Sequence, residues 1–487
     1  MEPGSIAFIV TIALLVIDFV IRVLAIVLIP RNRRPQTATA WLLAIFFLPY
    51  LGILLFWLLG SNYLPKRRRE KQAEINRYIE ETTEGIDQVT RTGAWPSWLE
   101  SIVELNRTLG AMPLVGGNRA KLYDENAVAL AAMAKAIRKA ERTVHCEFYI
   151  LSLDDETADF FDALEEAVAR GVKVRVLLDH LGNWQYPGFR RTKKRLTAMG
   201  ADWHLMLPVQ PLRGRYQRPD LRNHRKLLVI DGTVGFTGSQ NVIETPYQKR
   251  GNHRKGLHWK DFMVRFEGPV VAAIDALFVT DWYSETDELL TREVTTPVRP
   301  VTNGRLDCQV VPSGPGFEGE NNLRLFNSLV YAAQRQLIIT SPYFVPDDSM
   351  LYAITTAAQS GIDVQLFVSE IGDQFFVFHA QRSYYEALLK AGVRIFLYRS
   401  PTVLHAKHMT VDEEVAVIGS SNMDMRSFTL DLEISVMIRD RGFVERLRAV
   451  EDLYRLESRE LTLDEWMGRP LRLHVLDNIA RLTAAVQ

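Results

Sequence analysis

Two copies of one short motif contain the residues whose types and spacing suit chemistry. Both copies read H-x-K-x-x-x-x-D, and their defining residues are His224, Lys226, Asp231, His405, Lys407 and Asp412. Six residues after each aspartate comes G-S-x-N, which adds four candidate hydroxyl and amide donors: Ser239, Asn241, Ser420 and Asn422. One copy could arise by chance, but two copies at matching places in the chain are specific.

The spacing within the motif places its histidine and its lysine on one face of a strand. Both copies begin on apolar, β-rich runs, and residues i and i+2 of a strand point the same way. His224 therefore shares a face with Lys226, and His405 shares a face with Lys407. If the two copies pack about a pseudo-two-fold axis, two imidazoles and two ammonium groups meet in one site.

Such a site suits a phosphodiester substrate. One histidine would attack phosphorus and form a covalent intermediate. The other would protonate the leaving alkoxide and then deprotonate an incoming alcohol. The lysines, together with the serine and asparagine donors, would hold the non-bridging oxygens and the charge that builds on them. The two histidines need different protonation states, so their pKa values must differ. This chemistry requires no metal ion and no cofactor.

Several other polar residues are grouped with this site. Asp261 and Glu433 each follow their own histidine by a few tens of residues and could orient its imidazole, although a structural role is an equally good interpretation. Asn223, directly before His224, is a supporting residue. Asp231 and Asp412 count as catalytic motif residues, yet each closes its strand, and a structural turn role is the favoured interpretation. The remaining histidines are expected to be packed or surface residues: His145, His180, His204, His253, His258, His379, His408 and His474.

The elements around the motif repeat along the chain. Residues 143–151 predict a strand, and 171–178 predict a buried strand. Between them lies an amphipathic stretch whose apolar face would contain Phe160, Phe161, Leu164, Ala167 and Val168. The same series returns at 336–345, 349–360 and 361–368. Strands that alternate with helices indicate an α/β fold, and a period this long indicates domain duplication. We expect one domain over residues 111–297 and a second over 298–487.

The N-terminal region is expected to form a transmembrane helical hairpin over residues 1–62. Two apolar runs, about 6–30 and 38–60, are each long enough to span a bilayer as a helix. Asp18 and Arg22 interrupt the first run at a spacing that lets them pair, and Pro49 is expected to kink the second. Residues 63–110 read as a charged linker. Its basic start suits anionic headgroups and favours a cytoplasmic catalytic part.

Composition narrows the class of protein. Lysine plus arginine equals aspartate plus glutamate, 58 each, and this zero net charge argues against a nucleic-acid partner. The two cysteines, Cys146 and Cys308, are too few and too far apart for a zinc or disulfide framework.

The doubled motif resembles the signature of the phospholipase D superfamily, and nearly the whole chain is similar to the bacterial cardiolipin synthases. The stretches that carry this likeness are Arg33–Pro35, Ala40–Leu43, Leu48–Gly52, Leu221–Lys226, Trp259–Asp261, Glu267–Pro269, Ser341–Pro346, Leu404–Lys407 and Met425–Phe428. One departure is Asp431, where the family pattern leads us to expect asparagine.

The resemblance implies both fold and reaction. It implies two α/β domains, each a mixed sheet flanked by helices, which meet at one site. It also implies that phosphatidylglycerol donates its phosphatidyl group to His224 and releases glycerol, with His405 as acid and base. A second phosphatidylglycerol would accept the group. The implied location is the bacterial cell membrane, as a multi-pass protein in contact with anionic lipids.

Three alternatives stay open beside this interpretation. A hydrolytic phospholipase D shares both histidines, with water in place of the alcohol. A phospholipase-D-type nuclease is disfavoured by the neutral charge and the apolar spans. A lipid-binding scaffold without activity would be expected to lose a motif histidine or lysine, and all four are present. The acceptor lipid, the roles of the two histidines and the oligomeric state are not determined by the sequence.

Overall fold

The computed structural model of the chain describes residues 3–31, 33, 35–60, 64, 66–83, 95–290, 300–317 and 319–482. The chain consists of two units. The N-terminal unit comprises Met1–Leu64 with Arg218–Asp220, and the larger unit comprises Pro65–Gln217 with Leu221–Gln487. The expected boundary between residues 297 and 298 lies outside the described residues.

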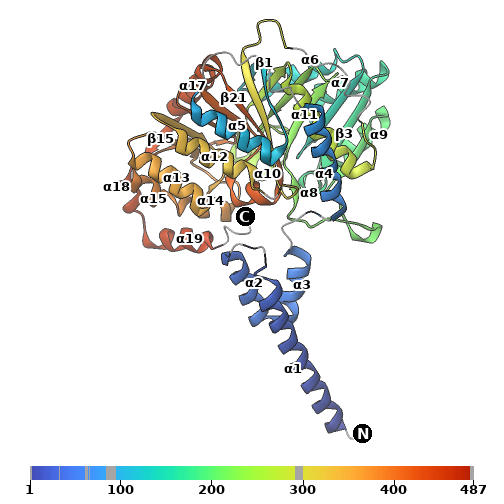
Figure 1. The fold of residues 1–487 in the computed structure, drawn as a ribbon, viewed down its shortest axis with the longest axis vertical. Helices are drawn as coiled ribbons and strands as arrows, with labels where there is room; N and C mark the ends of the chain where they lie inside the picture. Colours follow the sequence, from blue (N-terminus) through green and yellow to red (C-terminus); the bar gives the residue numbers. More distant parts are fainter. Residues whose placement is uncertain are drawn as a thin grey trace. The chain divides into compact units, whose positions relative to one another are not determined.

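The N-terminal unit begins with one long apolar helix, α1 (Pro3–Leu28), drawn in blue in Figure 1. Its segment Phe8–Leu28 is long and apolar enough to cross a membrane, with a mean hydropathy of 2.7. The expected pair within it forms, since Arg22 Nε lies 3.0 Å from Asp18 Oδ2. A neutralised pair of this kind is compatible with an apolar helix.

The second expected span is interrupted at Pro49, where a kink was expected, and the interruption is a complete break between two short helices. It is divided into α2 (Pro35–Phe47) and α3 (Pro49–Leu59). The break falls at Leu48, whose backbone is not helical (φ −134°, ψ 70°), because the residue before a proline is driven out of the helical region. Pro49 opens α3, where its missing N–H costs nothing. Gly52 lets the two short helices approach closely, since a Cβ there would lie 2.8 Å from Ile45 Cα.

The larger unit is built on one continuous mixed sheet, which runs β22-β16-β15-β13-β18-β19-β21-β12-β1-β11-β9-β8-β2-β3-β4. The strands of the first half are β1 (Leu114–Tyr123), β2 (Thr143–Phe148), β3 (Lys173–Asp179), β4 (Asp202–Met206), β8 (Lys226–Ile230), β9 (Val234–Gly238) and β11 (Met263–Glu267). Those of the second half are β12 (Leu306–Ser313), β13 (Gln336–Thr340), β15 (Asp363–Ser369), β16 (Arg394–Tyr398), β18 (His408–Val411), β19 (Val415–Gly419), β21 (Asp431–Arg439) and β22 (Ser458–Leu461).

The strand order shows the predicted duplication directly. Outward from the centre, the first half runs β1, β11, β9, β8, β2, β3, β4, and the second half runs β12, β21, β19, β18, β13, β15, β16. The halves meet where β1 pairs antiparallel with β12. Within each half, β2–β3–β4 and β13–β15–β16 pair in parallel, and the inner strands pair antiparallel. The predicted α/β fold of two similar domains with mixed sheets is confirmed.

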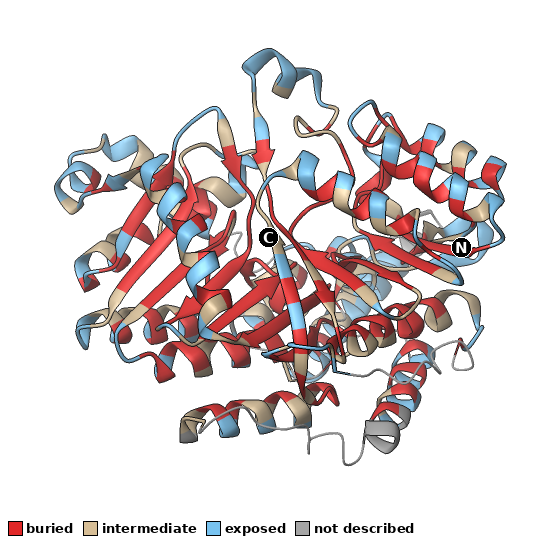
Figure 2. Cartoon of the chain, turned by 90° about the horizontal axis from the view of Figure 1, so that it is seen from above, coloured by how far each residue is buried: buried red, intermediate tan, exposed pale blue. Residues whose placement is uncertain are grey.

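Helices cover both faces of this sheet, so its strands are buried while the outer helix faces are exposed (Figure 2). The first half carries α6 (Asn126–Ile137), α7 (Ala158–Ala169), α9 (Phe189–Met199) and α11 (Val270–Thr286). The second carries α12 (Asn321–Ala332), α13 (Asp348–Gln359), α15 (Tyr385–Ala391) and α17 (Arg441–Leu456). The predicted amphipathic stretch forms α7, with Phe160, Phe161, Leu164 and Ala167 buried and Val168 partly buried against the same core.

Two helices lie within the stretch expected to be a charged linker. Helix α4 (Lys66–Thr83) rests on α11, where Lys71 Nζ donates to the carbonyl of Tyr283 over 2.6 Å. Helix α5 (Ser97–Gly110) packs on α12 and β12, and it buries Leu99 and Ile102 in the core of the second half. This stretch therefore contributes directly to the packing of the larger unit.

Short parallel strand pairs join the two halves near the motif histidines. Strand β7 (Arg222–Asn223) pairs with the start of β21, so that Asn223 lies beside Leu432. Strand β10 (His258–Lys260) pairs with β17 (Thr402–Leu404), so that Lys260 lies beside Leu404. In each pair, a segment of one half lies beside the segment that leads to a motif histidine of the other half. Strand β21 lies beside the segment before His224, and β10 lies beside the segment before His405.

Candidate active site

The two His–Lys pairs occupy equivalent places in the two halves. His224 follows β7 and Lys226 opens β8, while His405 follows β17 and Lys407 precedes β18. Neither histidine lies within a strand, so the predicted strand does not include the start of either motif. In each pair the lysine reaches back to the backbone of its histidine. Lys226 Nζ donates to the His224 carbonyl over 2.6 Å, and Lys407 Nζ donates to the His405 carbonyl over 2.8 Å. All four residues are buried in the fold.

The two pairs are close enough to influence each other's protonation. Burial and, after it, the positive charge of Lys407 lower the pKa of Lys226 to about 7. Burial also lowers the pKa of His224 well below its usual value, with Lys226, Lys407 and His405 acting in the same sense. The structure therefore brings the histidines and lysines of both motif copies near one another, an arrangement suited to an anionic phosphodiester.

Each histidine is oriented by a carboxylate from the opposite half. His224 Nδ1 lies 2.9 Å from Glu433 Oε1, and His405 Nδ1 lies 2.7 Å from Asp261 Oδ1. Both carboxylates are buried. An ionised carboxylate only accepts hydrogen bonds, so each Nδ1 carries the proton. Nε2 of His224 is then left for the reaction, while Nε2 of His405 lies 3.1 Å from Lys407 Nζ. The expectation that each carboxylate serves its own histidine is corrected, because the pairing is crossed.

Strand pairing is the reason for this exchange. The backbone N–H of His224 donates to the carbonyl of Leu432 over 2.9 Å, and that of His405 donates to the carbonyl of Lys260 over 2.8 Å. The next residues along these two partner segments are Glu433 and Asp261. The parallel pairs β7–β21 and β10–β17 thus deliver each carboxylate to the histidine of the other half.

The serines of G-S-x-N support the carboxylates. Ser239 Oγ donates to Asp261 Oδ1 over 2.7 Å, and Ser420 Oγ donates to Glu433 Oε2. Each serine oxygen also accepts a backbone N–H, that of Phe262 at 3.1 Å or that of Ile434 at 3.0 Å. A hydroxyl has one proton to donate, so these serines are not the phosphate donors that the motif suggested.

The predicted asparagine donors divide into two kinds. The Asn223 side chain donates to Glu147 Oε1 over 2.8 Å and accepts from the backbone N–H of Arg225. Asn241 is likewise used within the protein, since it donates to the Tyr247 hydroxyl over 3.0 Å and accepts from Ile150. Both therefore brace the strands around the motif.

Asn422 differs from these two amides. Its Oδ1 is buried and has no hydrogen-bond partner among the residues that the structure describes. A buried polar atom without a partner is costly to a fold, so such atoms are generally bonded to something. Because Oδ1 is an acceptor, this observation does not test the expected donor role, and Asn422 as a phosphate donor stays a prediction.

The motif aspartates lie away from the histidines, which corrects their placement among the catalytic residues. Strand β8 separates Asp231 from His224 by roughly 20 Å at the rise of an extended chain. The Asp231 carboxylate accepts the backbone N–H groups of residues 141, 142 and 143, and Asp412 accepts those of 334, 335 and 336. Both aspartates adopt positive φ, 52° and 50°, which short polar residues tolerate in turns. The favoured turn role is the one they occupy.

The two carboxylate–imidazole pairs differ electrostatically. Burial would raise the pKa of Asp261, but the neighbouring His405 and Lys407 lower it below its usual value. Burial raises the pKa of Glu433, although Lys226 and Ser420 oppose the rise. Asp261 is thus the more firmly ionised partner, and it favours a protonated His405 against the burial that lowers that histidine's pKa. His224, with the pKa well below 6.5, is the neutral imidazole.

The sequence reasoning missed an aromatic wall around the histidines. The Tyr149 ring lies 5.0 Å from the His224 ring, and the rings of Tyr247 and Tyr343 lie 6.2 and 6.4 Å from His405. Tyr343 belongs to one of the stretches that carry the family resemblance, so a signal for it was present. Tyr149 and Tyr247 have no such signal, because only the tertiary structure brings them to the site.

An ion pair accounts for the unusual residue at position 431. Arg426 Nε lies 3.1 Å from Asp431 Oδ2, and the negative charge of Asp431 raises the pKa of Arg426. Burial raises the pKa of Asp431, and the positive charges of Arg426 and His224 oppose the rise. The carboxylate therefore has a cationic partner that the expected asparagine would not require.

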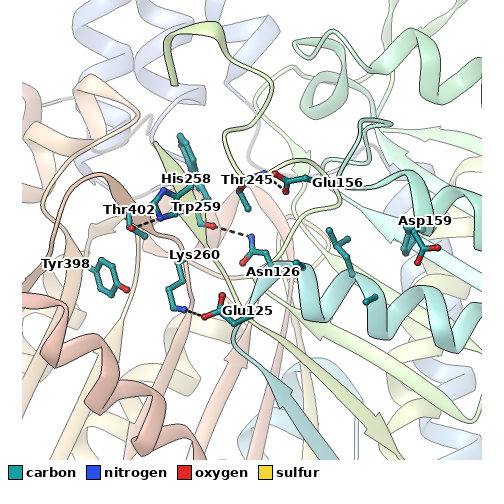
Figure 3. Close-up of a pocket in the computed structure, with 14 residues that line it drawn as sticks. Glu125, Asn126, Glu156, Asp159, Thr245, His258, Trp259, Lys260, Tyr398 and Thr402 are labelled. Atoms are coloured by element: carbon teal, nitrogen blue, oxygen red, sulfur yellow. Dashed lines mark hydrogen bonds and ion pairs between the residues drawn. The ribbon is translucent and has the colours of Figure 1, made fainter. Parts of the chain in front are cut away.

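A cavity of about 550 Å³ lies next to the β10–β17 pair and contains none of the four motif side chains (Figure 3). Its polar residues are bonded to one another: Lys260 Nζ lies 2.8 Å from Glu125 Oε1, and Thr402 Oγ1 lies 2.7 Å from His258 Nε2. Asn126 accepts from the backbone N–H of Asp261 over 3.0 Å and so steadies the carboxylate of the site. Across the described residues, no group of three or more His, Cys, Asp or Glu side chains is arranged to hold a metal ion.

Comparisons with known proteins agree with this geometry. Residues 133–259 and 327–452 match the family described as "Cardiolipin synthase, PLD-like domain", and residues 20–61 match "Phospholipase_D-nuclease N-terminal". The chain is 34% identical over 460 residues to cardiolipin synthase A of Proteus mirabilis (strain HI4320), covering 92% of each protein. It is 32% identical over 467 residues to a cardiolipin synthase of Alkalihalophilus pseudofirmus, covering 94% of this chain and 90% of that protein.

The solved structures add evidence on the fold. The phosphatidylserine synthase of Haemophilus influenzae Rd KW20 superposes with a TM-score of 0.59 at 15% identity, covering 79% of this chain and 99% of that one. At this identity the likeness concerns the fold alone. The fold and the doubled His–Lys site define a protein of the phospholipase D superfamily. Within that superfamily, the chain belongs to the cardiolipin synthase family.

Proposed function

We propose that this enzyme makes cardiolipin by moving a phosphatidyl group from one phosphatidylglycerol to another through a phosphohistidine. The observation that carries the proposal is the crossed pair of carboxylate–imidazole contacts, His224–Glu433 and His405–Asp261, around two lysines. Phosphatidylglycerol as donor and acceptor is supported by the names of the similar enzymes.

In the first step, Nε2 of His224 attacks phosphorus and the bond from phosphorus to the glycerol oxygen breaks. His405 gives its Nε2 proton to that oxygen, and glycerol leaves. In the second step, His405 takes the proton of the incoming hydroxyl, whose oxygen attacks phosphorus and releases His224. Lys226 and Lys407 neutralise the phosphoryl oxygens throughout, and they carry that charge in a buried site where it acts strongly.

The assignment of roles rests on the unequal carboxylates. A nucleophile must be neutral, and the pKa of His224 lies well below its usual value. A general acid must hold a proton. Burial lowers the pKa of His405 too, but the ionised Asp261 opposes this lowering, so His405 holds its proton more readily than His224 does. The pseudo-symmetric site therefore works with two distinguishable histidines.

The N-terminal apolar helix and the family associate the protein with a membrane. Beyond this, we propose a multi-pass protein of the bacterial cell membrane whose catalytic domains face the cytoplasm. In this arrangement α2 and α3 together complete a second passage beside α1, against which both pack. The basic run Lys66–Arg69 after α3 supports a cytoplasmic side. Labelling of single introduced cysteines in intact cells and in inverted vesicles tests this topology.

The function is tested with purified protein in detergent, labelled phosphatidylglycerol and analysis of the lipid products. We expect cardiolipin and one glycerol per turnover. His224→Ala and His405→Ala should each abolish turnover, while the matched control His253→Ala, an exposed histidine paired with Glu244, should retain it. If phosphatidic acid were the main product, the enzyme would be a hydrolase and not a synthase. Turnover that survives either motif substitution would contradict the two-histidine mechanism.

A further inference from the structure

The C-terminal helix α19 (Leu471–Arg481) turns an apolar stripe toward solvent. Leu471, Val475, Ile479 and the following Leu482 are exposed, and the exposed fractions of Leu471 and Leu482 are 77% and 83%. Their spacing of four, four and three residues places them on one side of a helix. A helix on a soluble surface normally points such a stripe at the core, so this orientation is inverted.

Helix α14 (Phe375–Arg382) extends this surface. It packs along α19, and the two helices lie near each other in Figure 1. Phe375 and Phe376 are exposed at its start, each by more than half of its surface. We call these six side chains the α14–α19 face: Phe375, Phe376, Leu471, Val475, Ile479 and Leu482.

Buried polar contacts hold α19 in this inverted orientation. Asp477 lies on the side of α19 that faces the protein and is buried. Its carboxylate lies 2.7 Å from His379 Nδ1, 2.8 Å from Arg469 Nη1 and 3.4 Å from Arg382 Nε. Specific contacts of Asp477 therefore turn the polar side of α19 toward the protein and leave its apolar side exposed. The exposure is not that of a frayed chain end.

The charges around the face suit an anionic surface. Helix α14 contains no acidic residue, and the acidic residue of α19 is the buried Asp477. Two cations of α19, Arg472 and Arg481, are exposed beside the stripe. Apolar side chains flanked by arginine are the pattern of helices that lie in the headgroup region of an anionic bilayer.

The face also adjoins the histidine site. Asp373 and Gln374, the two residues before α14, contact the Tyr343 hydroxyl at 2.9 and 3.1 Å. The Tyr343 ring in turn lies 6.4 Å from the ring of His405. A surface that rests on a membrane here would bring the bilayer to the edge of the site.

We propose that the α14–α19 face is a membrane-docking surface, which inserts into the headgroup region of an anionic bilayer and lets lipid reach the histidines. This proposal rests on the proposed function, since it assumes a substrate held in a bilayer. Docking positions the site at the depth of a phospholipid phosphate, which the N-terminal helix alone, as a tether, does not determine.

The full-length protein in vesicles of phosphatidylcholine and phosphatidylglycerol provides the test. Val475→Cys and Ile479→Cys are each labelled with a bimane, and Ala449→Cys on the exposed side of α17 is the matched control. Labelling is selective because Cys146 and Cys308 are buried. Spin-labelled phosphatidylcholine should quench the label at 475 and 479 but not at 449. Quenching at 475 no stronger than at 449 would overturn the proposal. It would also be overturned if the labels became buried as the protein concentration rises but were not quenched by lipid, because the face would then bind a second copy of the protein.

A functional measurement separates docking from chemistry. In Val475→Glu/Ile479→Glu, turnover of phosphatidylglycerol in vesicles should fall by about tenfold or more, because carboxylates are poorly accommodated at an apolar interface. Turnover of a short-chain, water-soluble phosphatidylglycerol should be unchanged. An equal loss on both substrates would overturn the docking role. If no variant and no parent protein makes cardiolipin while the labels at 475 and 479 are still quenched, the docking surface stands and the proposed function fails.

Discussion

The crossed pairing of carboxylates and histidines makes a prediction that an own-half pairing would not make. In Asp261→Asn, the residue that changes lies in the first half, but the imidazole that loses its carboxylate is His405 of the second half. We expect this variant to behave as one with an impaired general acid. Glu433→Gln should behave as one with an impaired nucleophile, since Glu433 contacts His224.

The structure sets the size of the effect. The contact between His405 Nδ1 and Asp261 Oδ1 is 2.7 Å long and buried, and Asp261 is the ionised partner of an imidazole that must become charged. A hydrogen bond to a charged group contributes about 1.5–3 kcal/mol, so its loss in the transition state predicts a roughly 10- to 150-fold decrease in turnover. The amide of asparagine keeps the shape, which limits structural damage.

A change of leaving group identifies the histidine affected. Glycerol leaves as an alkoxide that needs a proton, whereas nitrophenolate leaves without one. We therefore compare phosphatidylglycerol with phosphatidyl-p-nitrophenol and measure the initial burst of product release. Asp261→Asn should lose the full factor with phosphatidylglycerol and little with the nitrophenyl ester. Glu433→Gln should lose activity with both, because attack by His224 is needed in either case.

The reasoning would be refuted by one pattern in particular. If Asp261→Asn slows the nitrophenolate burst as much as Glu433→Gln does, Asp261 does not act through a general acid. Ser239→Ala provides an internal check, because its hydroxyl donates to Asp261 over 2.7 Å. It should reproduce the leaving-group pattern of Asp261→Asn with a smaller loss, because the carboxylate that contacts His405 stays in place.

Other variants test other parts of the site. Asp231→Ala and Asp412→Ala should each lower the free energy of unfolding by about 1–3 kcal/mol, since three backbone N–H groups lose their acceptor, while turnover of the folded protein persists; thermal melts and turnover at low temperature check this. The pKa of Lys226 falls from 10.5 to about 7 on folding, so the charged form is disfavoured by up to about 5 kcal/mol below pH 7, and this penalty is relieved as pH rises toward 10.5. Lys226→Met should therefore raise stability at pH 7 and flatten its pH dependence, as followed by denaturant unfolding. With the pKa of Lys407 at about 8, kcat/KM should fall as pH rises above the pKa values of the two lysines, and an unchanged rate across that range would contradict the need for two ammonium groups.

Local patterns predicted much of the fold. The amphipathic helix that carries Phe160 and Leu164 follows from periodicity, as do the strands around it, and the duplication follows from the repeated series of elements. A kink at Pro49 in the second apolar run was also expected from the sequence. Its extent was not: Pro49 excludes helical backbone at Leu48, so the run forms two separate short helices. Composition measures apolar length and does not distinguish a kink from a complete break.

The candidate site shows the same division. The sequence by itself paired His224 with Lys226 and His405 with Lys407 and predicted that these four residues bear the chemistry, because a spacing of two residues is a local property of the chain. Only the tertiary structure decided which carboxylate serves which histidine, since His224 and Glu433 are 209 residues apart and His405 and Asp261 are 144 apart. The same holds for Ser239, whose hydroxyl donates its hydrogen bond to Asp261. These pairings arise because a short strand of each half pairs with a strand of the other half, β7 with β21 and β10 with β17. The spacing of residues along the chain does not show which distant segments pair in this way.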